Sequence, residues 1–483
     1  MFATLQSLVD CIQLPKQNSR AECGCNSWWI GSRKLEQKEA RLCQVTLSDE
    51  LWSTKTTNLF LKGERMKTFL RYLCSSLLVG VLSAPLVSAQ QEVRVWILNT
   101  FSDTSLAAWD QIIADFEAAN PDIKIMLESR STDAHKDAMR VAAGTDGFPD
   151  IFFNWAGLGL GGEMVNLGVS APLDEAYASL GWSDRFLPAA LAKTEYNGER
   201  HGVPYTNHGM VVYYRKDSFE QAGITEEPQT YDELIAANQK LLEVGITPFS
   251  FGGSTNWHIM RLLDSLLETK CDAETHDALK AMTANWAEEP CATEAFVELK
   301  RWDTDGFLGE DYMGISPQDS NLLVYTGAAA MMLEGSWMVN AIADEGEDLA
   351  NYGMFPFPTG TNRLYFFAEM LYLGANSPNQ EAAIKFLDYI SSPEVQQANL
   401  GNFGAVSIVR DMDYGADRRP LDQEWSEIFA TLTEVYEPGD QAFPLAVNTE
   451  SWRIQNGVLT GEIDPNEAAA QLQTFIDNFK AGN

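Results

Sequence analysis

Short apolar runs alternate with longer stretches of helical periodicity between residues 93 and 155. Three of the runs have the length and composition of buried strands, namely VRVWIL, IKIML and PDIFFNW. Two helical stretches separate them, namely SLAAWDQIIADFEAANP and AHKDAMRVAAG. This order is typical of a parallel sheet with helices on its faces, and such sheets bind ligands beyond the carboxyl ends of their strands. Asp103 follows the first strand and Trp155 ends the third, so both are candidates for a binding site.

The segment that begins GVPYTNHGMVVYY predicts a second unit of strands and helices. MVVYY has the composition of a strand, and the helical stretch TYDELIAANQKLLEVG carries a capping box. In that box Thr230 is the N-cap residue and Glu233 lies three positions later, while Gly245 marks the end of the helix. The sequence therefore predicts the α/β class for this part of the chain as well.

The sequence predicts a secretory signal peptide over residues 66–89. The stretch MKTFLRYLCSSLLVGVLSAPLVSAQQ has a short basic head, an apolar body and a small-residue cleavage site that ends at Ala89. Its apolar run is shorter than the roughly 20 residues that span a bilayer, which disfavours a membrane anchor. Cys74 lies early in the apolar body and not at the cleavage site, so we expect no lipid anchor. The expected product is a soluble protein in the periplasm of a Gram-negative-type cell.

Residues 1–65 precede this signal and have no clear helical or strand periodicity. LKGERM, which ends at Met66, can be encoded by purine-rich codons of the kind that form a ribosome-binding sequence. We therefore expect translation to begin at Met66, with residues 1–65 as an upstream extension outside the translated protein. N-terminal sequencing that found authentic protein starting near Met1 would refute this expectation.

Length and charge restrict the remaining possibilities. Cleavage after Ala89 removes 89 of the 483 residues and leaves 394, which is more than one hydrophobic core usually organises, so we expect two lobes. Lys and Arg number 34 against 68 Asp and Glu, which gives a net charge of −34. This charge repels phosphate backbones and excludes nucleic acid as a partner.

Two cysteines remain in the mature chain, Cys271 and Cys291. An even pair in an oxidising compartment, separated by a polar helical stretch, favours a disulfide. Two free buried thiols are the alternative.

Several motifs argue against catalysis and cofactors. GLGLGG has the glycine spacing of a dinucleotide fingerprint in Gly157, Gly159 and Gly162, but it follows the third predicted strand and no acidic residue ends a following strand. A flexible turn beside a cleft is the better interpretation. The five histidines lack the spacing and the carboxylate neighbours of a zinc enzyme, and no G-x-S-x-G occurs. The sequence predicts no catalytic residue, no cofactor and no metal ion.

Four tryptophans lie at strand ends or helix starts beside small polar or charged residues. They are Trp155, Trp257, Trp337 and Trp452. A sugar ring has an apolar face of C–H bonds that stacks on an aromatic plane, and its hydroxyl groups need directed donors and acceptors. A tryptophan next to Asn, Ser, Glu or Arg supplies the aromatic plane together with hydrogen-bonding groups. Each of these rings could equally belong to the hydrophobic core.

The sequence resembles a known family at GVPYTNHGMVVYYRKDSFEQAGI and PQTYDELIAANQKL. This family is the extracellular solute-binding proteins of sugar ABC transporters, which includes maltose- and maltodextrin-binding proteins. Its pattern is met by Gly202, Pro204, Tyr214, Lys216, Phe219, Gly223, Pro228, Thr230, Tyr231 and Glu233. Three other stretches agree in order, AAGTDGFPDIFFNW, YTGAAAMMLEGSWMV and GANSPNQEAAIKFLDYISSPEVQ, so the resemblance extends from about Val93 to the C-terminus.

The resemblance implies a periplasmic-binding-protein-like fold of two α/β lobes around a ligand cleft, joined by a hinge of several crossings. The implied first lobe is 90–204 plus 353–375, and the second is 205–352 plus 376–483. Matching positions place Trp155, His208 and Trp337 at the cleft in stacking or hydrogen-bonding roles. Further candidates are Asp103, Asn207, Trp257, Glu369 and Trp452. Glu369 departs from the family pattern, since small residues are common in its crossing.

The implied function is that of a substrate-binding component of an ABC importer. It captures a mono- or oligosaccharide by hinge closure and delivers it to the permease subunits in the inner membrane, as a monomer and without catalysis. Basic residues near the predicted cleft are few, which disfavours an anionic ligand. Two alternatives remain: an exported carbohydrate-active enzyme, and a binding protein for a non-sugar solute such as a polyol.

Overall fold

The structure is a computed structural model that describes residues 90–482 except 100–101, 416–417 and 433. The predicted signal peptide and residues 1–65 lie outside the described residues. Within the described part of the chain, no helix has both the length and the hydropathy that a bilayer span requires.

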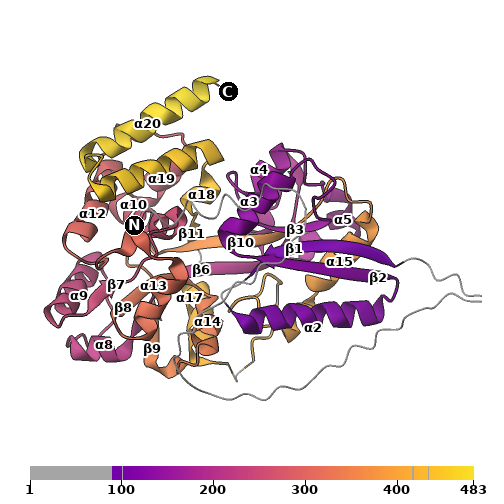
Figure 1. Cartoon of the computed structure of the whole chain (residues 1–483), viewed down its shortest axis with the longest axis horizontal. Coiled ribbons are helices and arrows are strands. Elements are labelled where there is room, and N and C mark those ends of the chain that lie inside the picture. The colour runs from indigo at the N-terminus through magenta and orange to yellow at the C-terminus, as the bar shows by residue number, and fades with distance from the viewer. Residues whose placement is uncertain (1–89, 100–101, 416–417, 433, 483) are drawn as a thin grey trace, which may run out of the picture. The chain divides into compact units, whose positions relative to one another are not determined.

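A mixed sheet of nine strands runs through the described residues (Figure 1). Its strands follow the order β2-β1-β3-β10-β6-β8-β7, with β9 paired to β6 and β11 paired to β10. The strands are β1 (Gln91–Leu98), β2 (Ile123–Arg130), β3 (Ile151–Trp155), β6 (Val203–Arg215), β7 (Thr247–Phe249), β8 (Ala329–Gly335), β9 (Tyr352–Phe355), β10 (Arg363–Leu373) and β11 (Glu434–Tyr436). A separate two-stranded sheet pairs β4 (Glu195–Tyr196) with β5 (Glu199–Arg200).

The first three strands have the predicted order. Helix α2 (Asp103–Ala119) connects β1 to β2, and α3 (Thr132–Ala142) connects β2 to β3. Strand β1 pairs in parallel with both β2 and β3, which confirms the parallel arrangement expected from the alternating pattern. Ser102 is the N-cap of α2, and its hydroxyl oxygen accepts a hydrogen bond from the backbone N–H of Ser105 (3.1 Å).

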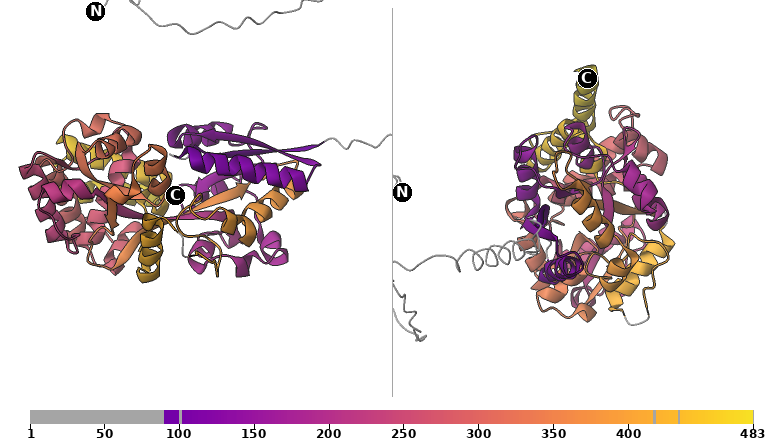
Figure 2. Two further views of the ribbon diagram at one scale, coloured as in Figure 1. Left: turned by 90° about the horizontal axis from the view of Figure 1, so that it is seen from below. Right: turned by 90° about the vertical axis from the view of Figure 1, so that its right-hand side faces the viewer.

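Strands β6 and β10 pass from one lobe into the other (Figure 2). At the start of β6, Val203 and Tyr205 belong to the hydrophobic core of the first lobe, around β1 and α2. Further along the same strand, Met210 and Val212 belong to the core of the second lobe. Strand β10 runs antiparallel to β6 and to β3, so it links the two halves of the sheet. The described chain is thus two α/β lobes joined by crossing strands, as the resemblance implies.

The predicted boundaries of the lobes stay a prediction, but the packing of several segments differs from them, α15 (Gln380–Ile390) and β9 among them. Helix α15 was expected in the second lobe, yet its apolar face belongs to the core around β1, where Phe386 meets Phe116 edge-on at 5.0 Å between ring centroids. Strand β9 was expected in the first lobe, yet it pairs with the second-lobe half of β6, from Val212 to Arg215. Both placements depend on contacts between segments far apart in the chain.

Helices build most of the second lobe. Four of them surround its core, α10 (Asn256–Lys270), α12 (Pro290–Thr304), α19 (Leu445–Thr460) and α20 (Pro465–Gly482). A disulfide joins Cys271, directly after α10, to Cys291 near the start of α12. The predicted cysteine pair therefore fastens two neighbouring helices of this lobe.

The predicted capping box lies at the start of α9 (Tyr231–Glu243). The Thr230 hydroxyl oxygen accepts from the Glu233 backbone N–H (3.3 Å), and the Glu233 carboxylate accepts from the Thr230 backbone N–H (3.1 Å). These two bonds confirm the prediction. Gly245 follows the helix in the left-handed region, with φ 79°.

The remaining helices lie on both lobes. In the first half of the chain they are α4 (Gly161–Asn166), α5 (Asp174–Ser179), α6 (Trp182–Arg185), α7 (Pro188–Ala192) and α8 (Lys216–Gln221). In the second half they are α11 (Ala273–Lys280), η1 (Tyr312–Gly314), α13 (Pro317–Tyr325), α14 (Met338–Asp344), η2 (Leu349–Asn351), α16 (Pro393–Ala398), α17 (Pro420–Thr431) and α18 (Gly439–Ala442). Of these, α14 and α18 bring second-lobe residues to the site described next.

Candidate ligand-binding site

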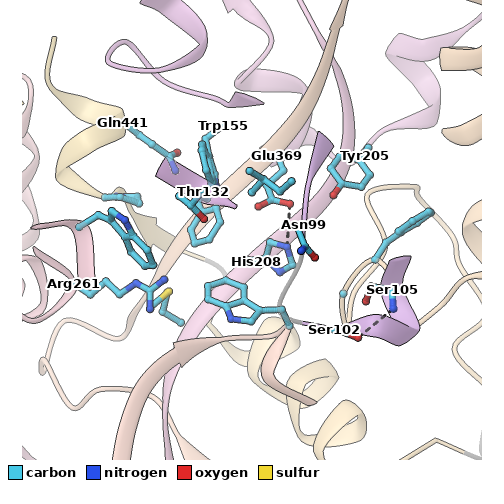
Figure 3. Close-up of a pocket in the computed structure, with 18 of the residues that line it drawn as sticks. Asn99, Ser102, Ser105, Thr132, Trp155, Tyr205, His208, Arg261, Glu369 and Gln441 are labelled. Atoms are coloured by element: carbon cyan, nitrogen blue, oxygen red, sulfur yellow. Dashed lines mark hydrogen bonds and ion pairs between the residues drawn. The ribbon is translucent and has the colours of Figure 1, made fainter. Parts of the chain in front are cut away.

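A pocket of about 1060 Å³, part of it open to solvent, lies between the lobes (Figure 3). The first lobe lines it with Asn99, Ser102, Ser105, Thr132, Lys136 and Trp155. The crossing strands contribute Tyr205, His208, Phe367 and Glu369, and the second lobe contributes Trp257, Arg261, Trp337, Asn340, Asp440 and Gln441. The first-lobe residues follow the carboxyl ends of β1, β2 and β3, where a parallel sheet presents its binding residues.

Two indole rings line the pocket from different lobes. Trp155 ends β3, and its half-buried ring packs edge-on against Phe153 at 4.9 Å between centroids. Trp337 precedes α14 as its N-cap residue, and its ring meets His208 edge-on at 5.0 Å. A Cβ atom at Gly335 would overlap the Trp337 ring, so glycine is needed at that position to seat the indole.

A hydrogen-bonded pair, His208 and Glu369, joins β6 to β10 beside these rings. His208 Nε2 lies 3.2 Å from a Glu369 carboxylate oxygen, and His208 Nδ1 lies 2.8 Å from the Ser336 hydroxyl. A carboxylate only accepts hydrogen bonds, so Nε2 carries the proton and donates; in the neutral ring Nδ1 then accepts from Ser336. Burial, reinforced by the Glu369 carboxylate, raises the pKa of Tyr205 well above its ordinary value, so its hydroxyl stays a donor.

Two basic side chains also line the pocket, and each has an acidic neighbour. Lys136 Nζ lies 4.8 Å from the centroid of the Trp155 ring and 3.6 Å from the Asp440 carboxylate. Burial raises the pKa of Asp440, and Lys136 opposes that rise. Arg261 donates to the buried Glu334 carboxylate (2.7 Å). Lys and Arg side chains in the lining are therefore few, and their charges are compensated by nearby carboxylates.

No metal centre accompanies these groups: across the residues that the structure describes, no cluster of three or more His, Cys, Asp or Glu side chains is placed to hold an ion.

Residues 102–397 match the family described as bacterial extracellular solute-binding protein. The chain belongs to this family.

Two relatives of this solute-binding protein illustrate the range of the family. An uncharacterized ABC transporter extracellular-binding protein of Pyrococcus horikoshii is 26% identical over 437 residues, which cover 85% of this chain and 92% of that protein. The maltotriose-binding protein of Pyrococcus abyssi is 23% identical over 335 residues, which cover 66% of this chain and 67% of that protein.

Solved structures share the fold of this solute-binding protein. A chitin oligosaccharide binding protein superposes with a TM-score of 0.74 at 24% sequence identity and covers 80% of this chain and 98% of its own. A maltose-bound protein of T. maritima superposes with a TM-score of 0.65 at 18% identity and covers 80% of this chain and 99% of its own. These likenesses confirm the predicted periplasmic-binding-protein-like fold.

Five of the eight ligand-binding residues predicted for this solute-binding protein line the pocket. They are Trp155, His208, Trp257, Trp337 and Glu369. They come from strands and helices far apart in the chain, and the fold brings them around one space.

The other three predicted residues lie outside the lining. Asp103 is the exposed first residue of α2, beside the lining residue Ser102. Asn207 precedes His208 in β6 and is buried, but it is not among the residues that line the pocket. Trp452 lies on α19, and its Nε1 is 3.2 Å from the sulfur of the lining residue Met260, so Trp452 is next to the lining but not part of it.

Sequence reasoning missed several lining residues. Asn99, Thr132 and Lys136 follow β1 and β2, so the rule that led to Trp155 could have identified them. Arg261 and Asp440 lie in α10 and α18, and no local motif marks them. Their positions follow from the packing of the second lobe.

Proposed function

We propose that the protein is the substrate-binding component of an ABC importer, that it binds an uncharged mono- or oligosaccharide between its lobes, and that it delivers the sugar unchanged to a membrane permease. One observation carries the proposal. Trp155 and Trp337, from different lobes, line one pocket together with the hydrogen-bonded pair His208 and Glu369.

The chemistry of this lining suits a saccharide. Indole rings stack on the apolar face of a pyranose, and Glu369 offers carboxylate oxygens to its hydroxyl groups. Tyr205 and Asn99 add a hydroxyl and an amide at the same pocket. Because Lys136 and Arg261 have carboxylate neighbours, the site has no strong excess of positive charge to attract an anion. The similarity to a maltotriose-binding protein and to a chitin oligosaccharide binding protein supports the same ligand class.

Binding is coupled to a hinge motion in this proposal. Strands β6 and β10 connect the lobes, and residues on both lobes contact the ligand. A ligand stabilises the closed form only through contacts that the open form lacks, so a sugar held by both lobes shifts the equilibrium toward closure. The permease then recognises the closed form.

Export through the inner membrane would bring the protein to the periplasm, where an ABC importer takes up its ligand. The predicted signal peptide over residues 66–89 directs it to the periplasm, and membership of an extracellular family supports that location. The released protein has no lipid anchor in this proposal.

The experiment that tests the function is a thermal-shift screen of the mature protein against a panel of mono- and oligosaccharides, with chromatography of each sugar afterwards. A receptor shows a higher melting temperature with at least one sugar and returns that sugar unchanged. Any turnover would favour the alternative, an exported carbohydrate-active enzyme. A shift with polyols alone would replace the saccharide by a polyol within the same class of receptor.

A further inference from the structure

Two sets of contacts join the lobes at the edges of the pocket, and we call the first the Asp344 bridge. Asp344 ends α14 in the second lobe. Its carboxylate accepts hydrogen bonds from the Ser102 hydroxyl (2.6 Å), the Thr104 hydroxyl (2.6 Å) and the Thr104 backbone N–H (3.1 Å), all at the start of α2 in the first lobe. The positive end of the helix dipole favours a carboxylate there. Beside it, the Asn340 amide donates to the Ser105 hydroxyl (3.2 Å).

We call the second set the glycine bridge. It joins Gly157 and Gly159, in the turn after β3, to the segment around α18 in the second lobe. The Gly159 backbone N–H donates to the Gln441 carbonyl oxygen (3.3 Å). A Cβ atom at Gly159 would overlap the carbonyl oxygens of Asp440 and Phe443, and one at Gly157 would overlap Gln441. The GLGLGG turn therefore serves a backbone contact between the lobes.

The two bridges bound the pocket on opposite sides. In Figure 3, Gln441 of the glycine bridge and Ser102 of the Asp344 bridge lie on either side of His208, and Trp155 and Glu369 lie between them. A ligand that extended past His208 toward either side would have to separate one bridge. Separation would remove three hydrogen bonds on the Asp344 side or the direct backbone packing on the glycine side.

We infer that the two bridges restrict the ligand to a saccharide of one or two rings, enclosed between the lobes; this inference rests on the proposed function. A long oligosaccharide that lay along the line between the two bridges would need one of these two sides to be open, and both are closed by protein contacts.

The test measures affinity against ligand length. Mature protein is titrated calorimetrically with glucose, xylose, galactose and N-acetylglucosamine and with their linear oligomers of up to six rings. In any series that binds, we expect the tightest Kd at one or two rings and a Kd at least tenfold weaker at four rings. Equal or tighter binding of a four-ring ligand would overturn the inference while leaving the proposed function intact. Failure of every series to bind would contradict the proposed function itself.

Variants of the bridges test the cause of the restriction. Gly159→Ala introduces the overlapping Cβ, and Gly159 has no positive φ that would strain alanine, so the effect is confined to the bridge. Gly314→Ala is the matched control, because a Cβ there meets nothing within 4 Å. Neither residue lines the pocket.

We expect Gly159→Ala to weaken binding of the short ligand at least tenfold and to reduce the difference between two and four rings to less than threefold. Gly314→Ala should change neither value. Asp344→Asn, which keeps the side-chain shape, provides a second variant with the same expectation should Gly159→Ala fold poorly. Unchanged length discrimination in a folded variant of either bridge would refute the role of that bridge.

Discussion

At the scale of single residues, Trp337 is the side chain on which the site depends most. Its ring lines the pocket and also packs against the edge of the hydrophobic core, so its loss removes stacking area from the site. We expect Trp337→Ala to weaken sugar binding by about 1 to 3 kcal/mol in calorimetry. Trp337→Phe, which keeps an aromatic ring, should retain most of the affinity. An unchanged Kd in Trp337→Ala would remove this residue from the site.

His135 gives a prediction about pH. Its Nε2 donates to the Phe153 carbonyl oxygen (2.8 Å), and burial lowers the pKa of His135 from 6.5 to about 4. Between these values the unfolded chain binds a proton that the folded protein does not bind, so the free energy of unfolding falls as pH falls from 6.5 to 4. By the usual conversion this one group accounts for about 3 kcal/mol across that range.

The measurement is urea unfolding at several pH values between 4 and 7. We expect His135→Gln to be less stable near neutral pH but to lose less stability on acidification than the native protein does. The pKa values of His201, His258 and His276 are also lowered, so a slope remains in the variant. Parallel curves for the two proteins would contradict the assignment.

At the scale of secondary-structure elements, the disulfide fixes α10 against α12. Cys271 and Cys291 are 20 residues apart, and closing such a loop stabilises a protein by about 3 kcal/mol in the chain-entropy account. We expect the double variant Cys271→Ser, Cys291→Ser to lose about this much free energy of unfolding in urea and to bind the same sugars, because neither cysteine lines the pocket. A reducing agent should destabilise the native protein and leave the double variant unchanged. Equal unfolding curves with and without reductant would count against the bond.

Some secondary-structure elements could be predicted from the sequence, and others could not. The capping box of α9 and the strands and helices from β1 to β3 depend on residues close together in the chain, so local patterns were sufficient to identify them. The packing of α15 against Phe116 joins residues more than 250 positions apart, and no local pattern encodes it. The neighbours of Glu369 likewise come from β3 and β6, which only the folded sheet brings together.

At the scale of the whole molecule, we expect the protein to change shape when it binds its ligand. The bridges exist only when the lobes meet, and a sugar that contacts both lobes shifts the population toward that form. We expect the radius of gyration of the mature protein, measured by small-angle X-ray scattering, to fall when a sugar found in the thermal-shift screen is added at saturation. A sugar that fails to bind in the screen is the control. A radius that stays constant while calorimetry reports saturation would refute hinge closure.

The most direct measurement is a crystal structure of the mature protein with a bound sugar from that screen. We expect an intact saccharide between the lobes, with a ring face against Trp155 or Trp337 and a hydroxyl group hydrogen-bonded to the Glu369 carboxylate. A sugar bound elsewhere, or a cleaved product in the pocket, would contradict it.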